Sequence, residues 1–176
     1  INTGVYKPDQ VKPSFSPSMD IQVSSNFERL LFDIVNEDDQ RVYLLMKNLS
    51  QDGFFKLSQA ELKVIKRDFC AETINNKDTL SIIKEVESKY DFILDPHTAT
   101  AVGAAKKINS LSTTIVLGTA HPYKFLETVK MATGKEVKSP VHFYKISDKK
   151  ERYDVLENNI LEVKKYILKK VAWKLN

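Results

Sequence analysis

The sequence has 176 residues, of which 42% are apolar and 28% charged, and its formal net charge is +4. A chain of this size can bury a core of its own, and its composition is that of an ordinary globular protein. No apolar run approaches the roughly 18 residues of a membrane-spanning helix, which excludes a transmembrane role. The single cysteine, Cys70, excludes an internal disulfide and a cysteine-rich metal site. The lack of paired cysteines fits a reducing compartment, so we expect a cytoplasmic protein.

The predicted elements begin after an N-terminal loop. Residues 1–16 carry two prolines and a glycine without an apolar period, so no regular structure is expected there. Ser25 and Glu28 have the S-x-x-E spacing of a capping box, and apolar residues follow at 3–4 spacing. We therefore expect a helix that opens at Ser25 or Asn26.

Helical signals continue through residues 38–90. Asp38 or the next residue is expected to cap a helix that ends before Gly53, which favours a left-handed stop. Ser58 and Glu61 repeat the capping-box spacing and predict another helix. A further helix is expected from about Lys77 to Lys89, on the apolar stripe Leu80, Ile83 and Val86.

Residues 92–132 alternate between strand and helix signals. Residues 92–94 (FIL) are interpreted as a short strand, followed by Asp95 as a helix cap and Pro96 at the first helical position. Residues 112–117 (STTIVL) are apolar and β-branched, and they are the strongest strand signal in the chain. Gly118 ends that strand, and Pro122 opens a helix that stops at Gly134.

The remaining residues predict a strand at 141–146 and a final helix from about residue 151. The apolar stripe of that helix is Tyr153, Leu156, Ile160, Val163 and Ile167. The excess of lysines lies here, but the lysines alternate with glutamates and no aromatic platform accompanies them. A solvated helix face is therefore expected, and a nucleic-acid partner is not.

The order of elements predicts a helix-rich α/β protein. We interpret residues 1–176 as a single, partial α/β domain with a helical insertion near 38–90.

The turn after residues 112–117 is the first candidate site. In open α/β sheets, ligands bind beyond the carboxyl ends of the strands. Gly118 would let a flat ligand approach the backbone, and Thr119 would present its hydroxyl there. Thr119 could instead cap the helix opened by Pro122. His121 could lie beside the ligand or act as a cap, and His97 has the same two interpretations. The three histidines show no metal-ligand spacing.

The second candidate site is the start of the first helix. Ser24, Ser25 and Asn26 surround a helix N-terminus, where free N–H groups favour an anion. Arg29 could add a bidentate contact to a phosphate or carboxylate. Capping alone would also explain Ser25, and Arg29 could simply lie on the polar face.

Three tracts, in this order, carry a resemblance to a known family. They are residues 16–21 (SPSMDI) running into 24–29 (SSNFER), then 94–99 (LDPHTA), then 117–122 (LGTAHP). Together they resemble the C-terminal part of threonine synthase. The resemblance implies the C-terminal portion of a fold-type-II pyridoxal phosphate enzyme, similar to the tryptophan synthase β subunit. The family's activity is that of a lyase in threonine biosynthesis, which converts O-phosphohomoserine and water to threonine and phosphate.

The resemblance also implies roles for the two candidate sites. Threonine synthases belong to the pyridoxal phosphate enzymes in which a serine or threonine hydroxyl meets the pyridine nitrogen, and Thr119 matches that position. Gly118 and His121 would complete the cofactor side. O-phosphohomoserine carries both a phosphate and a carboxylate, which suits the group formed by Ser24, Ser25, Asn26 and Arg29.

The family's cofactor lysine has no match here. It lies in a Ser-Phe-Lys-Asp-like context well before the SSNFER tract, whereas Phe54-Phe55-Lys56 comes after that tract. The five glycines do not cluster into a phosphate loop. Because the sequence opens at Ile1 without a methionine, we expect a fragment. Because the cofactor lysine is missing, we expect no catalytic residue in it. Its partner would be the N-terminal part of the same enzyme. The alternative is a non-catalytic α/β module that binds an anion or a partner.

Overall fold

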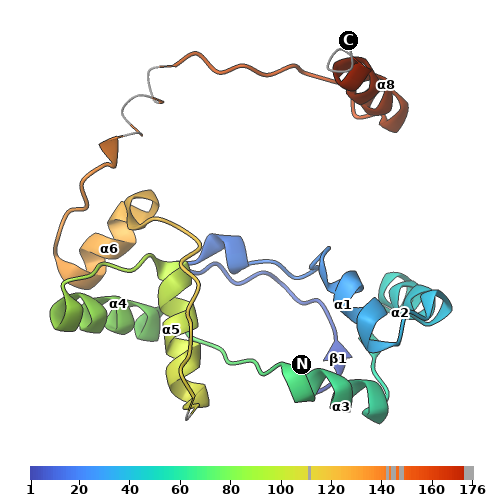
Figure 1. Cartoon of the computed structure of the whole chain (residues 1–176), viewed down its shortest axis with the longest axis horizontal. Coiled ribbons are helices and arrows are strands. Elements are labelled where there is room, and N and C mark those ends of the chain that lie inside the picture. The colour runs from blue at the N-terminus through green and yellow to red at the C-terminus, as the bar shows by residue number, and fades with distance from the viewer. Residues whose placement is uncertain (111, 142, 144–145, 147–148, 173–176) are drawn as a thin grey trace. The chain divides into compact units, whose positions relative to one another are not determined.

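A computed structural model describes residues 1–110, 112–141, 143, 146 and 149–172. The chain forms two compact units, Ile1–Lys138 and Ser139–Asn176, and each is considered by itself. Figure 1 shows that helices dominate the first unit, and none of the described helices is long and apolar enough to cross a membrane.

The first group of elements surrounds a small sheet. The strands β1 (Val5–Tyr6) and β2 (Phe55–Lys56) are antiparallel, with Val5 opposite Lys56 and Tyr6 opposite Phe55. The helices α1 (Phe27–Ile34), α2 (Asp39–Asp52) and α3 (Gln59–Asp68) pack with this sheet. The shared core consists of Leu31, Ile34, Leu45, Phe55, Leu57 and Ile65.

The second group consists of α4 (Asn76–Tyr90), α5 (Pro96–Ile108), the short 3₁₀ helix η2 (Pro122–Phe125) and α6 (Leu126–Thr133). Both α5 and α6 pack on α4 (Figure 1). Gly103 allows α5 to approach closely, because a Cβ built there would lie 2.5 Å from Ile82 Cδ1. The core of this group is Ile82, Ile83, Leu94, Ala99 and Ala132.

Most of the predicted helix ends are confirmed. Asp38 accepts from Arg41 N–H at the start of α2, and Gly53 ends that helix in the left-handed region with φ 77°. Ser58 and Glu61 form both bonds of a capping box on α3. Asp95 caps α5, as expected from the following proline. Each of these caps is a local interaction, which is why the sequence predicts it.

Three predictions about local structure are wrong. Asn26, and not Ser25, is the N-cap of α1, and it makes no side-chain capping bond, so the expected Ser25–Glu28 box does not form. Residues 92–94 and 112–117 are not strands. A strand needs a hydrogen-bonded neighbour, and among the described residues β1 and β2 pair only with each other.

The second unit contains α8 (Ile160–Ala172). This helix begins later than the predicted start near residue 151, and Tyr153 and Leu156 precede it. The strand predicted at 141–146 falls partly outside the described residues, but Val141, Phe143 and Ile146 are described and are helical. The apolar residues Ile160, Leu161, Ile167 and Leu168 of α8 are exposed.

Candidate functional site

A largely apolar cavity of about 580 Å³ lies between α5 and the residues that follow it. The segment after α5 runs back alongside that helix (Figure 1). One wall is the alanine-rich side of α5, with Ala101, Ala104, Ala105 and Ile108. The opposite wall consists of Thr114, Ile115, Val116, Leu117 and Thr119, and Met19, Cys70, His97 and Ser110 complete the lining.

Thr119 lies on this cavity, although it does not follow a strand. Its side chain is exposed and belongs to a segment without regular secondary structure. The apolar residues before it are also exposed, since Ile115 is 84% and Leu117 73% accessible. The strand context predicted for Thr119 is therefore wrong, but the prediction that it faces a cleft agrees with the cavity lining.

Gly118 and His121 flank Thr119. A Cβ built on Gly118 would meet no atom within 4 Å, so the approach to this stretch of backbone is open. His121 is exposed, and its Nδ1 accepts a hydrogen bond of 3.1 Å from Tyr123 N–H at the start of η2. His121 therefore caps the start of η2, which is one of the two interpretations given for it above.

The residues predicted to bind substrate meet at the N-terminus of α1. Arg29 Nη2 donates to Asn26 Oδ1 at 3.0 Å, so the guanidinium folds back over the turn that carries Ser24 and Ser25. Phe27 N–H donates to Ser24 O at 3.2 Å and closes this turn. A positively charged group and a helix N-terminus therefore lie together, which is favourable for an anion.

Tyr6 holds this turn in place, and sequence reasoning missed it. Its hydroxyl donates to Gln22 O at 2.8 Å and accepts from Ser24 N–H at 2.9 Å. Its ring stacks on Phe27 and on Phe55, with centroid distances of 5.5 and 5.0 Å. Tyr6 lies in a part of the sequence without an apolar period, and nothing near it predicts these contacts, because its partners are distant in the chain.

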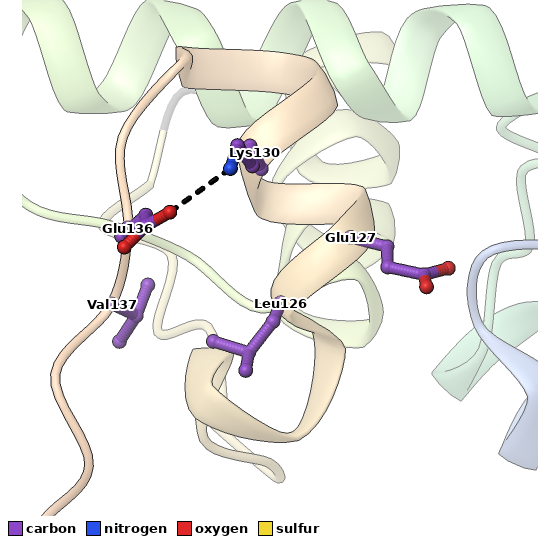
Figure 2. A pocket seen from close by; sticks show the side chains of 5 residues that line it. All are labelled: Leu126, Glu127, Lys130, Glu136 and Val137. Carbon is purple, nitrogen blue, oxygen red and sulfur yellow. Dashed lines mark hydrogen bonds and ion pairs between the residues drawn. The ribbon is translucent and has the colours of Figure 1, made fainter.

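The two predicted groups line different cavities. Ser24 contributes to a small cavity of about 20 Å³ beside Tyr6, whereas Thr119 lines the 580 Å³ cavity. Another cavity, of about 280 Å³, lies beside α6 (Figure 2). Lys130 and Glu136 form an exposed ion pair of 2.9 Å there, and none of the predicted site residues contributes to its lining.

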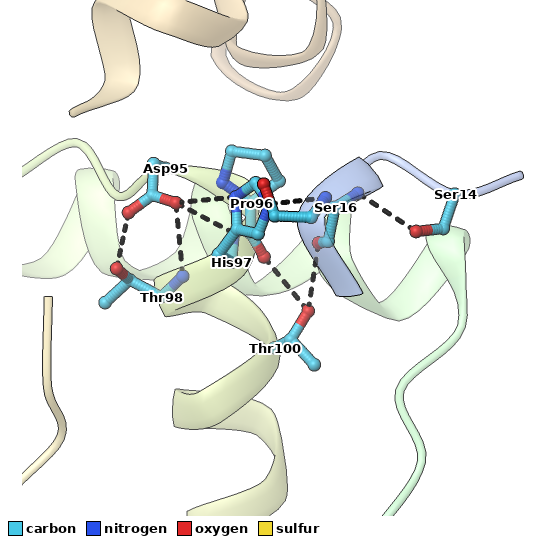
Figure 3. A network of polar contacts seen from close by, with 8 residues as sticks. Ser14, Ser16, Asp95, Pro96, His97, Thr98 and Thr100 are labelled. Atoms are coloured by element: carbon cyan, nitrogen blue, oxygen red, sulfur yellow. Dashed lines mark hydrogen bonds and ion pairs between the residues drawn. The ribbon is translucent and has the colours of Figure 1, made fainter. Parts of the chain in front are cut away.

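A buried polar network lies at the start of α5 (Figure 3). Asp95 Oδ1 accepts from His97 N–H at 2.9 Å and from Thr98 N–H at 3.3 Å, and it lies 3.2 Å from His97 Nδ1. Asp95 Oδ2 accepts from the Thr98 hydroxyl. On the other side of the imidazole, Ser18 N–H donates to His97 Nε2 at 3.2 Å. The Asp95 carboxylate thus accepts from free N–H groups at the start of α5, and it also orients the His97 ring.

This network joins the sequence tracts that carry the resemblance. Ser16 and Ser18 belong to the first, and His97 to the second. The hydroxyls of Ser16 and Thr100 lie 3.3 Å apart, which adds a second contact between η1 (Pro17–Met19) and α5. The ring of His97 packs on Phe125 of η2, directly after the third tract, with a centroid distance of 4.8 Å. Tracts that are distant in sequence are therefore neighbours in space.

Comparison with known proteins supports the resemblance that these tracts carry. A family profile described as "Threonine synthase, C-terminal" matches residues 98–167. The threonine synthase of Pseudomonas aeruginosa is 38% identical over 165 residues, which cover 92% of this chain and 35% of that protein. The threonine synthase of Corynebacterium glutamicum is 35% identical, with 89% and 34% covered. The chain belongs to the threonine synthase family.

Solved structures of threonine synthases have the same fold. The pyridoxal phosphate-bound enzyme of Brucella melitensis superposes with a TM-score of 0.80 at 39% identity, covering 94% of this chain and 36% of that one. The yeast threonine synthase gives a TM-score of 0.74 at 31% identity, covering 97% and 39%. The predicted fold class, a helix-rich C-terminal portion of an α/β enzyme, is confirmed. The chain spans about a third of the length of the threonine synthases that it matches.

Proposed function

We propose that this chain is the C-terminal part of a cytoplasmic threonine synthase, a lyase that forms threonine and phosphate from O-phosphohomoserine and water. The observation that carries the proposal is the match to the pyridoxal phosphate-bound Brucella melitensis enzyme over 94% of the chain. The two clusters described above suit the two molecules that such an enzyme must hold. The chain contributes binding groups, and the proposal assigns it no catalytic residue.

The 580 Å³ cavity suits the pyridine ring of pyridoxal phosphate. Small-molecule pockets usually enclose about 300–1,000 Å³ and are mainly apolar with a few polar groups. The alanine-rich face of α5 is flat and apolar, and the Thr119 hydroxyl is the polar group that would meet the ring nitrogen. Gly118 leaves the backbone open, and His121 lies two residues beyond Thr119. When bound, the cofactor supplies an electron sink, which a neutral hydroxyl at the ring nitrogen would temper.

The N-terminus of α1 suits the anionic groups of O-phosphohomoserine. Asn26 makes no capping bond to the first turn, and its oxygen instead accepts from Arg29. The guanidinium of Arg29 therefore lies at the start of α1, in contact with the residue that follows Ser24 and Ser25. A phosphate or a carboxylate could accept from both the guanidinium and the first N–H groups of α1.

The remaining part of the enzyme is the proposed partner of residues 112–117. Ile115 and Leu117 are exposed, although β-branched and apolar residues of this kind usually pair in a sheet. In an enzyme of the length of its relatives, this segment would become a strand beside strands of the other two thirds. With this pairing, residues 1–176 would form one partial α/β domain, with a helical insertion near 38–90.

The test is a chimeric enzyme in which this chain replaces the matching third of the Pseudomonas aeruginosa threonine synthase. With pyridoxal phosphate and O-phosphohomoserine, the chimera is expected to release phosphate and form threonine, and the 176-residue chain alone is expected to form none. Thr119→Val should lower kcat/KM at least tenfold, while Thr119→Ser, which keeps the hydroxyl, should stay within threefold. A soluble chimera that binds the cofactor but forms no threonine would contradict the proposed activity.

A further inference from the structure

Asp95 and His97 form a buried pair that the proposed function does not use. They are 2% and 4% exposed, and they lie at the first turn of α5. Titratable groups are rarely buried so deeply unless they have partners, and here both have them. His97 also lines the 580 Å³ cavity, together with Thr119. The pair therefore lies between the interior and the proposed cofactor site.

The hydrogen bonds define the orientation of the imidazole. Nε2 accepts from Ser18 N–H at 3.2 Å, so this nitrogen carries no proton in the network. Nδ1 then carries the proton and donates to Asp95 Oδ1 at 3.2 Å. A carboxylate on one ring nitrogen is a common device for holding a histidine in one tautomer and one direction. The ring of His97 thus has little freedom.

Two segments contact this ring, η1 and η2, and each adjoins or contributes to the lining of the cavity, which is called its rim below. Through Ser18, His97 holds η1, and η1 brings Met19 to the cavity lining. Through the ring contact of 4.8 Å with Phe125, it supports η2, which begins three residues after Thr119. These contacts come from three distant parts of the chain, and Figure 3 shows Ser16 of the first part beside the start of α5.

We propose that His97 is a positioning residue, which Asp95 orients so that its ring holds η1 and η2 at the rim of the Thr119 cavity. What the cavity binds rests on the proposed function, but the coupling of the two segments does not. An ordinary core histidine would contribute to global stability only. A positioning histidine also determines local order at residue 18 and at 119–125, and this difference can be measured.

The experiment measures amide hydrogen exchange by NMR in the 176-residue chain for four variants. His97→Phe keeps a ring against Phe125 but loses both ring-nitrogen bonds, so the Ser18 amide should exchange at least tenfold faster than in the wild type. His97→Gln places an amide oxygen near the position of Nε2 and should keep Ser18 within threefold of the wild type. Phe125→Leu removes the ring contact and should accelerate exchange at 119–125 at least fivefold, with Ser18 unchanged.

The matched control is Thr79→Val, which removes a hydrogen bond from another buried polar residue, on α4. It should change exchange at Ser18 by less than twofold once global stability is taken into account. If His97→Phe does not fold, the comparison of His97→Gln with Phe125→Leu still decides the question. Exchange at Ser18 and 119–125 that follows global stability alone in these variants would overturn the proposal.

A second readout connects the residue to the cavity. In the chimeric enzyme, His97→Phe should raise the dissociation constant of pyridoxal phosphate at least tenfold, and His97→Gln, which keeps only the acceptor for Ser18 N–H, should raise it by less. An unchanged cofactor affinity in His97→Phe would show that the rim does not depend on the bonds of the two ring nitrogens and would overturn the proposal. A wild-type chimera that forms no threonine would contradict the proposed function, whereas the exchange data would still test the positioning role.

Discussion

Glu61→Gln is expected to destabilise the chain in a pH-dependent way. Glu61 accepts from Arg41 through both carboxylate oxygens, at 2.7 and 3.0 Å, and also from Ser58 N–H at 2.6 Å. The hydrogen bonds from Arg41 are the main reason that the pKa of Glu61 falls from its ordinary value of 4.5 to about 2. Glutamine can still accept from Ser58 N–H, so the substitution removes the ion pair and leaves the helix cap.

The pKa shift sets the upper limit of the effect. One pKa unit corresponds to about 1.4 kcal/mol, so a fall of this size corresponds to roughly 3 kcal/mol of folding free energy. The side chains of Arg41 and Glu61 are 30% and 14% exposed, so water screens part of the attraction. We therefore expect Glu61→Gln to lower the free energy of unfolding by about 1–2 kcal/mol at pH 7. This value lies between those typical of surface ion pairs and of buried ion pairs.

The sign of the pH dependence follows from the lowered pKa. A carboxyl group whose pKa is depressed in the folded state stabilises that state above its unfolded pKa, near 4.5. This contribution is lost as the pH falls through about 2, where the folded state also takes up the proton. The difference between the wild type and Glu61→Gln should therefore be largest above pH 5 and should shrink steadily toward pH 2.

The assay is urea unfolding of the 176-residue chain, followed by circular dichroism at several pH values. Glu85→Gln is the matched control, since it removes the Lys106–Glu85 ion pair, in which both side chains are about half exposed. It should leave the unfolding midpoint unchanged. A difference between the wild type and Glu61→Gln that does not vary between pH 7 and pH 2 would show that the Arg41–Glu61 ion pair does not contribute to stability in this way.

Three further predictions concern packing and helix ends. Ile83→Ala should cost about 3 kcal/mol in urea unfolding because Ile83 is fully buried, whereas Ile115→Ala, at 84% exposure, should cost less than about 0.5 kcal/mol. Gly134→Ala should lower the free energy of unfolding by about 1 kcal/mol in a thermal melt, because Gly134 ends α6 with φ 72°. The control is Gly118→Ala, at an open position without a positive φ. Asp95→Ala should cost at least about 2 kcal/mol, because it removes the cap of α5 and leaves buried donors unsatisfied; an unchanged melting temperature would contradict this.

The candidate sites show how far sequence reasoning reached. The sequence predicts Thr119 in the turn after a strand, and Thr119 does line the largest cavity described above, but no strand precedes it. The sequence leaves two interpretations for His97, because no local pattern says that Ser18 and Phe125 lie against its ring. It carries no signal for Tyr6. The contacts of these residues join positions between 16 and 79 residues apart, or depend on a fold that brings them together.

Helix ends that depend on neighbouring residues can be predicted from the amino-acid sequence alone. Asp38, Ser58 and Asp95 each bond N–H groups two or three residues away, and Gly53 ends its helix through its own backbone freedom, so a short window contains the whole interaction. The sequence also carries the three tracts that identify the family. These features need no knowledge of the rest of the chain.

Which segments pair and which distant side chains come into contact depends on the tertiary structure. Residues 112–117 have the composition of a strand, yet a strand forms only where another segment supplies hydrogen-bonding partners, and in this unit residues 114–117 line a cavity instead. The burial of His97 between η1, α5 and η2 likewise required all three segments to be in place. The difference lies in the separation of the bonded groups along the chain. Capping bonds join groups within one helical turn, whereas strand pairing and buried networks join groups that are far apart in the sequence.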